Sequence, residues 1–173
     1  MQSGALPQWL DLRRVGAAGA RLEGEVELAA LARLGERLTA TQGLARAQVV
    51  VTFDQSRQAV VSGSVDALVR MRCERCLGEV DVPLCGVFSL AVVESEPAAD
   101  ALGGEDEPVV ASGGRLAVHR LVEDELLLAL PIVARHEDQA CDGGQRTFGP
   151  EGEALPEREN PFAALERLKR DRS

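Results

Sequence analysis

Two cysteines separated by two residues are the strongest chemical signal in this sequence. Cys73 and Cys76 lie in the string Cys-Glu-Arg-Cys-Leu, between two stretches that favour β-strands. A turn between strands can aim both sulfur atoms at one cation, which supplies half of a tetrahedral zinc site. His136 and Cys141 are the candidates for the other half. No cofactor follows with certainty from these residues, and a structural zinc ion is the candidate.

Two other interpretations of the cysteine pair stay open. Cys73 and Cys76 can be buried or half-buried thiols that bind no metal. They can also form a metal- or redox-responsive module, although thioredoxin-type sites have a strand that leads into a helix. The fourth cysteine, Cys85, lies in a β segment, and we expect it to be a small core residue.

The sequence signatures of common enzymes do not occur in the chain. It contains no Gly-x-Ser-x-Gly, no His-Glu-x-x-His and no Gly-x-Gly-x-x-Gly string. Its one lysine, Lys169, follows a leucine, so the Gly-Lys pair of a phosphate-binding P-loop is missing as well. We therefore expect a protein that is not an enzyme.

Several charged side chains are candidates for contact with a partner. A short basic run beside the cysteine turn could bind RNA, because guanidinium groups match the geometry of phosphates. Acidic residues of a predicted helix and basic residues near the C-terminus could bind a protein. The candidate RNA or partner contacts are Arg70, Arg72, Arg75, Glu123, Asp124, Lys169 and Arg170. The alternative for each of them is an ordinary solvated surface.

The composition limits the classes of function. The 173 residues carry a formal net charge of −9, which disfavours tight nonspecific binding to nucleic acid. Aromatic residues make up only 3%, so the core must consist of Leu, Val and Ala, and large stacking platforms for single-stranded nucleic acid are excluded. No apolar run approaches the roughly 20 residues of a transmembrane helix or the length of a signal peptide. We expect a cytoplasmic protein that does not bind membranes.

The elements that would position these residues predict an α+β fold. Apolar and polar residues alternate over 21–28, which indicates a half-buried strand, and a short N-terminal amphipathic helix over 29–38 follows. Short strands joined by short turns then favour an antiparallel β meander. The strands of this meander are predicted over 45–53, 59–62, 65–71 and 79–93.

The rest of the chain completes a single domain over 1–173. A mobile acidic loop is predicted at about 94–108, with Val109-Val110 as a short strand after it. One longer amphipathic helix follows over 116–130 and ends at Pro131. An irregular segment at about 135–159 precedes a short C-terminal helix, which would start at Asn160-Pro161.

Three strings in this order resemble the YceD family, the large-subunit ribosomal RNA accumulation proteins of bacteria and plastids. The first is the cysteine pair inside a β block, and the second is Leu-Val-Glu-Asp-Glu-Leu-Leu-Leu-Ala-Leu-Pro over 121–131. The third is Asn-Pro-Phe-Ala-Ala-Leu-Glu-Arg-Leu-Lys-Arg over 160–170. The resemblance spans nearly the whole chain, including Leu6-Pro7 and the strand at Gly24-Glu25.

The resemblance implies a cytoplasmic accessory factor and not a known enzyme. Family members are linked to synthesis, processing or stability of the large-subunit 23S ribosomal RNA. The implied partners are ribosomal RNA, pre-ribosomal particles or a basic assembly protein. One branch of the family has an extra cysteine-rich segment after the Ala-Leu-Pro string, whereas this chain has only Cys141 there. A zinc ion would therefore need His136 or water as its fourth ligand.

Overall fold

The computed structural model describes residues 4–54, 57–102, 107–137 and 141. The chain divides into two units, Met1–Gly143 and Gly144–Ser173, and the second lies outside the described residues. The predicted C-terminal helix, with Lys169 and Arg170, falls in that second unit. The assignment of 1–173 to a single domain stays a prediction.

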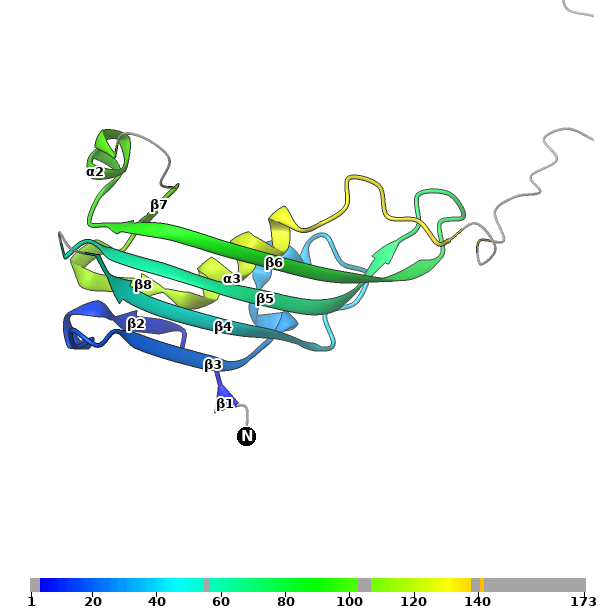
Figure 1. Cartoon of the computed structure of the whole chain (residues 1–173). Coiled ribbons are helices and arrows are strands. Elements are labelled where there is room, and N and C mark those ends of the chain that lie inside the picture. Colours follow the sequence, from blue (N-terminus) through cyan, green and yellow to red (C-terminus); the bar gives the residue numbers. More distant parts are fainter. Residues whose placement is uncertain (1–3, 55–56, 103–106, 138–140, 142–173) are drawn as a thin grey trace, which may run out of the picture. The chain divides into compact units, whose positions relative to one another are not determined.

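Four long antiparallel strands form the centre of the sheet (Figure 1). In chain order they are β3 (Ala20–Glu27), β4 (Leu44–Phe53), β5 (Ala59–Arg72) and β6 (Glu79–Val93). Their sequences alternate between inward apolar and outward polar side chains, as the period of two requires. In β5, for example, Val61, Val65 and Val69 are buried, whereas Ser64 and Asp66 are exposed.

The edges of this sheet correct the predicted fold, because they make the sheet mixed and not an antiparallel meander. β1 (Gly4–Ala5) pairs with β3 in parallel, and β7 (Glu107–Val110) pairs with β6 in parallel. The described part of the chain also has more of its residues in strands, and fewer in helices, than the predicted fold. Strands of two to four residues are too short to show a period, which is why sequence patterns did not predict these pairings.

A second correction concerns the helices. The predicted helix over 29–38 is a 3-10 turn, η2 (Leu28–Ala30), and the four-residue helix α1 (Ala32–Gly35). The predicted helix over 116–130 is shorter and starts at Val118, as α3 (Val118–Leu128). The residues before Val118 instead form β8 (Arg115–Ala117), which pairs with β2 (Trp9–Asp11) in a two-stranded sheet. Pairing with a distant strand here overrides the local helical pattern.

The acidic stretch at 94–108 contains regular structure. This stretch includes the six-residue helix α2 (Glu96–Ala101), which has proline in its first turn. The last two residues of the stretch belong to β7. Two further 3-10 turns, η1 (Leu12–Arg14) and η3 (Ser112–Gly114), flank the small β2–β8 sheet. Among the described residues, no helix has the length and apolar character needed to cross a membrane.

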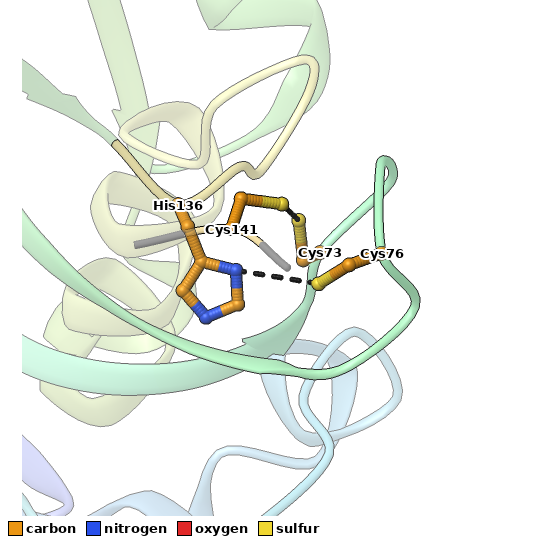
Figure 2. A group of neighbouring side chains, drawn as sticks. All are labelled: Cys73, Cys76, His136 and Cys141. Carbon is orange, nitrogen blue, oxygen red and sulfur yellow. Dashed lines mark hydrogen bonds between the residues drawn. The ribbon is translucent and has the colours of Figure 1, made fainter. Parts of the chain in front are cut away.

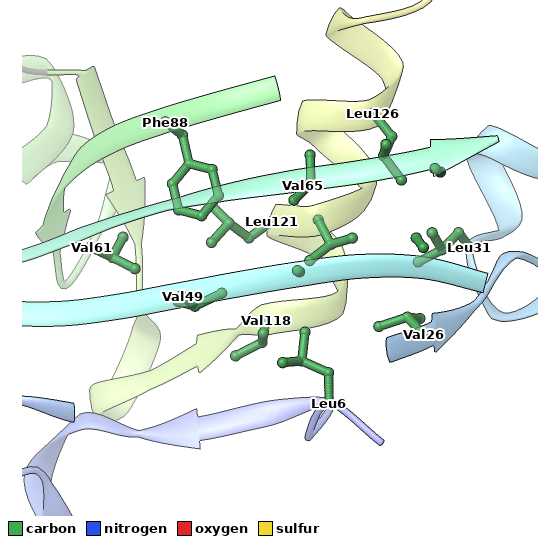
Figure 3. Packing of buried hydrophobic residues seen from close by; sticks show 14 of the residues in the cluster. Leu6, Val26, Leu31, Val49, Val61, Val65, Phe88, Val118, Leu121 and Leu126 are labelled. Atoms are coloured by element: carbon green, nitrogen blue, oxygen red, sulfur yellow. The ribbon is translucent and has the colours of Figure 1, made fainter. Parts of the chain in front are cut away.

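One face of the large sheet packs against α3, α1 and the chain around β2 to form the core (Figure 3). The core is made mainly of Leu, Val and Ala, with Phe88 as its aromatic ring. Phe88 lies opposite Gly63 in the β5–β6 register, and a Cβ on Gly63 would come within 2.7 Å of the ring. Glycine at this position therefore makes room for the ring in a core with few aromatic side chains.

Candidate metal centre

A tight turn at the end of the β5–β6 hairpin carries the cysteine pair. β5 ends at Arg72, and β6 begins at Glu79. The backbone N–H of Cys73 donates to the carbonyl of Gly78 at 2.7 Å, and the N–H of Leu77 donates to the carbonyl of Cys73 at 2.9 Å. Leu77 has φ of 65°, in the left-handed region, which reverses the chain just after Cys76. This geometry turns both sulfur atoms to the same side.

The chain that follows α3 lies beside this turn. The N–H of Glu74 donates to the carbonyl of Ala134 at 2.9 Å. Ala134 is buried with Cys73 and Val80 in a small apolar cluster, separate from the main core. This contact brings His136, two residues further along, against the cysteine turn.

Four side chains from these two segments converge: Cys73, Cys76, His136 and Cys141 (Figure 2). The Sγ atoms of Cys73 and Cys141 are 3.8 Å apart, and the Sγ of Cys76 is 3.5 Å from Nδ1 of His136. All four potential ligand atoms lie within 4.8 Å of one another. The four residues predicted from the sequence as metal ligands are therefore brought together.

These distances fit a tetrahedral ion. Zn–S bonds of about 2.3 Å and Zn–N bonds of about 2.0–2.1 Å place two sulfur ligands about 3.8 Å apart and a sulfur and a nitrogen about 3.5–3.6 Å apart. The Cys73–Cys141 and Cys76–His136 distances match these two edges. The cluster can therefore hold a metal ion with little rearrangement.

The orientation of His136 also suits ligation. Its Nε2 lies 2.7 Å from the backbone carbonyl of Glu79, which can only accept a hydrogen bond. Nε2 must therefore carry a proton, which leaves the Nδ1 lone pair directed at the sulfur cluster in the neutral ring. Metal-binding histidines are commonly fixed by such a bond from the second ring nitrogen to a carbonyl.

Backbone amides around the turn favour the thiolate of Cys73. The N–H of Cys76 is the main cause, and the N–H groups of His136 and Arg75 add to it against the opposing effect of burial. Together they lower the pKa of Cys73 to about 5. This cysteine is therefore a thiolate at neutral pH, the form that binds metals.

The other members of the cluster respond to the negative charge that gathers there. The N–H of Gly78 lowers the pKa of Cys76, but burial and the sulfur atoms of Cys141 and Cys73 outweigh it and raise that pKa overall. Contact with the sulfurs of Cys73 and Cys141 raises the pKa of His136. Burial is the larger cause for Cys76, but the sulfur atoms contribute to both shifts by placing negative charge in a small volume, which a cation would relieve.

The fourth cysteine has a different environment, and the prediction that Cys85 is a core residue is wrong. Cys85 is exposed, and it lies on the outward face of β6, opposite Asp66 of β5. The residues of β6 that are buried in the main core lie on the other face: Leu84, Phe88, Leu90 and Val92. The alternation is visible in the sequence, because Asp81 and Ser89 share the outward face with Cys85, and it was the signal that could have shown this cysteine to be exposed.

The three arginines predicted as RNA contacts lie along or beside the cysteine turn. Arg70 is paired with Asp81 at 2.9 Å and with Glu79 at 3.7 Å, and these acids raise its pKa. Arg72 is exposed at the end of β5, and Arg75 is half-buried within the turn. Arg70 therefore shares its charge with its own chain, whereas Arg72 faces solvent.

The acidic residues predicted as partner contacts fasten two helices together. Glu123 of α3 is only 8% exposed, and its Oε1 accepts from the backbone N–H groups of Arg33 and Leu34 at 2.7 and 3.2 Å. The Arg33 guanidinium binds Oε2 of Glu123 at 2.7 Å and Oδ1 of Asp124 at 2.6 Å. We call these three residues, Arg33, Glu123 and Asp124, the carboxylate clamp. Arg33 is ninety residues away in sequence, and no local signal indicated it.

The chain is thus a β-rich protein whose paired-cysteine turn, with a histidine and a third cysteine, can hold a metal ion. A family model described as "Large ribosomal RNA subunit accumulation protein YceD" matches residues 61–169. A protein of that name from Haemophilus influenzae is 34% identical over 131 residues, which cover 73% of this chain and 75% of that protein. The chain belongs to the YceD family. No solved structure matches it. The family is named for the accumulation of an RNA and not for a catalysed reaction.

Proposed function

We propose that this protein is a non-enzymatic accessory factor for the accumulation of large-subunit 23S ribosomal RNA. It acts in the cytoplasm by binding ribosomal RNA, a pre-ribosomal particle or a basic assembly protein. Membership of the YceD family supports the process, since the family and the Haemophilus influenzae relative are both named for it. Whether the protein serves the synthesis, the processing or the stabilisation of the RNA depends on which of these partners it binds.

The convergence of four ligands carries the mechanistic part of the proposal. Zinc sites with four protein ligands are structural, because no coordination position stays open for a substrate. Cys73, Cys76, His136 and Cys141 form such a closed set from two segments more than fifty residues apart. Zinc bound there would hold the turn after β5 against the chain after α3 and give the turn a fixed shape.

This fixed turn would present arginine side chains to a partner. Arg72 lies just before the turn, and Arg75 lies within it. Arg70 lies on the same outward face of β5 as Arg72. Because Arg70 is neutralised by Asp81 and Arg72 is exposed, the larger contribution to phosphate binding is assigned to Arg72, with Arg75 beside it in the turn. Lys169 and Arg170 remain further candidates in the unit that the structure does not describe.

One observation favours a second candidate function, a redox-responsive module. A cysteine with a pKa of about 5 is a nucleophilic thiolate. Cys73 is however fully buried, which restricts the access of oxidants and thiols. Measuring bound zinc and the rate of thiol alkylation in the same sample separates the two: one zinc per chain with slow alkylation supports the structural site, and rapid alkylation of a metal-free protein supports the redox module.

The function is tested by the ratio of large- to small-subunit ribosomal RNA in cells that lack the protein. We expect a selective loss of the large-subunit RNA, which the wild-type protein restores and the double variant Arg72→Ala/Arg75→Ala restores only in part. Arg46→Ala is a matched control, because Arg46 is an exposed β-strand arginine that is paired with Glu25 at 3.1 Å. An unchanged ratio in cells without the protein would overturn the proposed function.

A further inference from the structure

A hollow beside the small β2–β8 sheet contains the only tryptophan of the chain. Its volume is about 650 Å³, and strands β7 and β8, helix α2 and the start of α3 contribute to its walls. Trp9, Arg115, Arg120, Glu96 and Asp124 are among its lining residues. The hollow shares no residue with the cysteine cluster.

The indole of Trp9 is held in place but not buried. Trp9 lies opposite Ala117 in the β2–β8 register and is 47% exposed. The guanidinium carbon of Arg115 lies 5.0 Å from the centre of the Trp9 ring, within the range of a cation–π contact. The largest apolar side chain in the sequence thus lines a solvent-filled hollow, where its ring remains available to a ligand.

Three arginines lie in or next to the small β2–β8 sheet: Arg13 in η1, Arg115 in β8 and Arg120 at the start of α3. Arg13 forms a two-pronged pair with Asp11, with Nε–Oδ1 and Nη2–Oδ2 distances of 2.9 and 3.0 Å. Its side chain lies against Gly114, whose φ is 74° and where a Cβ would come within 2.9 Å of the arginine. Arg115 and Arg120 line the hollow itself. Because Asp11 already binds Arg13, Arg115 and Arg120 are the guanidinium groups that a phosphate in the hollow could meet.

The carboxylates in the wall argue against a site for phosphate alone. Glu96 and Asp124 would repel a bare anion, although Arg33 at 2.6 Å and, more weakly, Arg120 at 3.9 Å offset the charge of Asp124. A nucleobase differs from phosphate because it has a flat face that stacks on indole and N–H groups that donate to carboxylates. An aromatic ring, arginines and carboxylates in one hollow therefore match a nucleotide unit better than either an anion or a basic peptide.

We propose that the hollow at Trp9 binds one unpaired nucleobase of RNA, with the adjoining phosphates on Arg115 and Arg120. The inference rests on the proposed function, in which the protein contacts ribosomal RNA. One indole accommodates one base, so the site agrees with the scarcity of aromatic residues that excludes a longer stacking platform. Specific single-stranded regions of RNA are commonly bound in this way, with splayed bases stacked on aromatic or guanidinium planes.

Fluorescence gives a direct test, since Trp9 is the only tryptophan and reports on this hollow alone. The full-length protein is titrated with a ten-nucleotide single-stranded RNA, with GMP and with inorganic phosphate. We expect saturable quenching by the RNA, weaker quenching by GMP and none by phosphate. Quenching by phosphate at the same concentration would indicate an anion site and overturn the proposal, as would no quenching by RNA. Quenching by a proline-rich or basic peptide with none by RNA would assign the hollow to a protein partner instead.

Variants test the assignment independently of the signal from Trp9. With a fluorescein-labelled RNA, Trp9→Ala and Arg115→Ala should each weaken binding about tenfold, since stacking of one base contributes about 1–3 kcal/mol. Trp9→Phe should retain most of the binding, and Arg46→Ala, the exposed arginine paired with Glu25, should retain all of it. Melting temperatures identify any variant that fails to fold. If Trp9→Ala does not fold, RNA binding by Trp9→Phe and Arg115→Ala tests the site instead. Equal binding by wild type and Arg115→Ala would contradict the site.

Failure of this inference can be distinguished from failure of the proposed function. If cells without the protein lose large-subunit RNA, but Trp9→Ala and Arg115→Ala both restore it and RNA does not quench Trp9, the function stands and the base-binding hollow is wrong. If the RNA ratio is unchanged in such cells while RNA quenches Trp9 with the expected dependence on Arg115, the hollow stands and the function is wrong.

Discussion

The cysteine cluster and the carboxylate clamp both fasten segments that lie far apart in the sequence, but they do so by different chemistry. The clamp joins the start of α1 to α3, with Arg33 and Glu123 ninety residues apart. The cysteine cluster joins the β5–β6 turn to the chain after α3, with Cys73 and Cys141 separated by 68 residues. In the clamp, the charges of Glu123 and Asp124 are balanced by Arg33 and by backbone amides. The cysteine cluster gathers thiols around one imidazole, and its balance calls for a cation.

The two regions also differ in how much apolar packing supports them. The helices that carry the clamp rest on the main core, where Leu31, Leu34 and Leu126 are fully buried. The cysteine cluster is supported by a small group of three buried residues, Cys73, Val80 and Ala134. A region with so little buried apolar surface has little hydrophobic stabilisation. We infer that the clamp refines an arrangement that packing already favours, whereas the arrangement at the cysteine turn would depend on a bound metal ion.

Loss of the metal should have the largest effect. With free zinc about a thousandfold above its dissociation constant, bound zinc would add about 4 kcal/mol to the free energy of unfolding. Chelation or Cys141→Ser should remove most of this and lower the melting temperature, which thermal melts with and without added zinc would measure. Hydrogen exchange should rise mainly in 73–78 and 134–137.

Cys85→Ser is the matched control for this prediction, because Cys85 has the same chemistry but is exposed and outside the cluster. It should leave the zinc content and the melting temperature unchanged. If Cys141→Ser and Cys85→Ser behave alike, ligation does not stabilise the turn and the contrast between the two regions fails.

The clamp should show the next largest effect, with a sharp difference between its two acids. Glu123→Ala removes a nearly buried carboxylate, leaves two amides without their acceptor and leaves the Arg33 guanidinium with Asp124 alone, so it should cost about 2–3 kcal/mol. Asp124→Ala removes an acid whose side chain is 45% exposed and should cost less than about 1 kcal/mol. Urea denaturation of both variants measures the difference. Similar losses would show that burial does not set the strength of the clamp.

Local patterns in the sequence predicted the residues of the cysteine cluster but not those of the carboxylate clamp. The spacing of Cys73 and Cys76 indicates a ligand pair by itself, and the scarcity of other soft ligands then points to His136 and Cys141. The clamp depends on a contact between Arg33 and Glu123 that no spacing shows, because both residues look like ordinary charges on helix surfaces. Long-range polar contacts of this kind are fixed by packing and leave no local period.

The fold was also predicted correctly only in part. Alternation over 21–28 predicted β3, and runs of β-favouring residues predicted β4 and β6. The same runs predicted two strands, over 59–62 and 65–71, where β5 is one continuous strand. The prediction of an antiparallel meander was wrong at its edges, where β1 and β7 have two and four residues and pair in parallel. β8 was read as the start of a helix because its partner, β2, is more than one hundred residues earlier in the chain.

A smaller effect should come from backbone strain in the cysteine turn. Leu77 has φ of 65° and is 46% exposed, so its side chain gains little from burial. The left-handed conformation costs a residue with a Cβ about 1–2 kcal/mol, which glycine avoids. Leu77→Gly should therefore stabilise the protein by about 0.5–1 kcal/mol without changing its zinc content, as measured by denaturation.

The same turn offers a control for this prediction. Glu74 is not one of the described residues that have a positive φ. Glu74→Gly therefore relieves no strain and should destabilise the protein slightly. Equal and opposite shifts for these two glycine substitutions would locate the strain at Leu77. Destabilisation by both would show that the leucine side chain contributes more than its exposure suggests.

The smallest effect should come from Glu125, which is two residues from Glu123 but lacks its favourable surroundings. Burial raises the pKa of Glu125, and the nearby charges of Glu107 and Asp124 raise it further. A carboxyl whose pKa is higher in the folded state stabilises the fold below about pH 4.5, and that stabilisation is lost as the pH rises through the folded-state pKa. At pH 7, Glu125→Gln removes the unfavourable charge and should raise the free energy of unfolding by a few tenths of a kcal/mol, given partial screening by solvent. This gain should vanish near pH 4. A loss of stability at pH 7 that shrinks as the pH falls would mean that Glu125 is stabilised as a carboxylate, and the contrast within α3 would then be wrong.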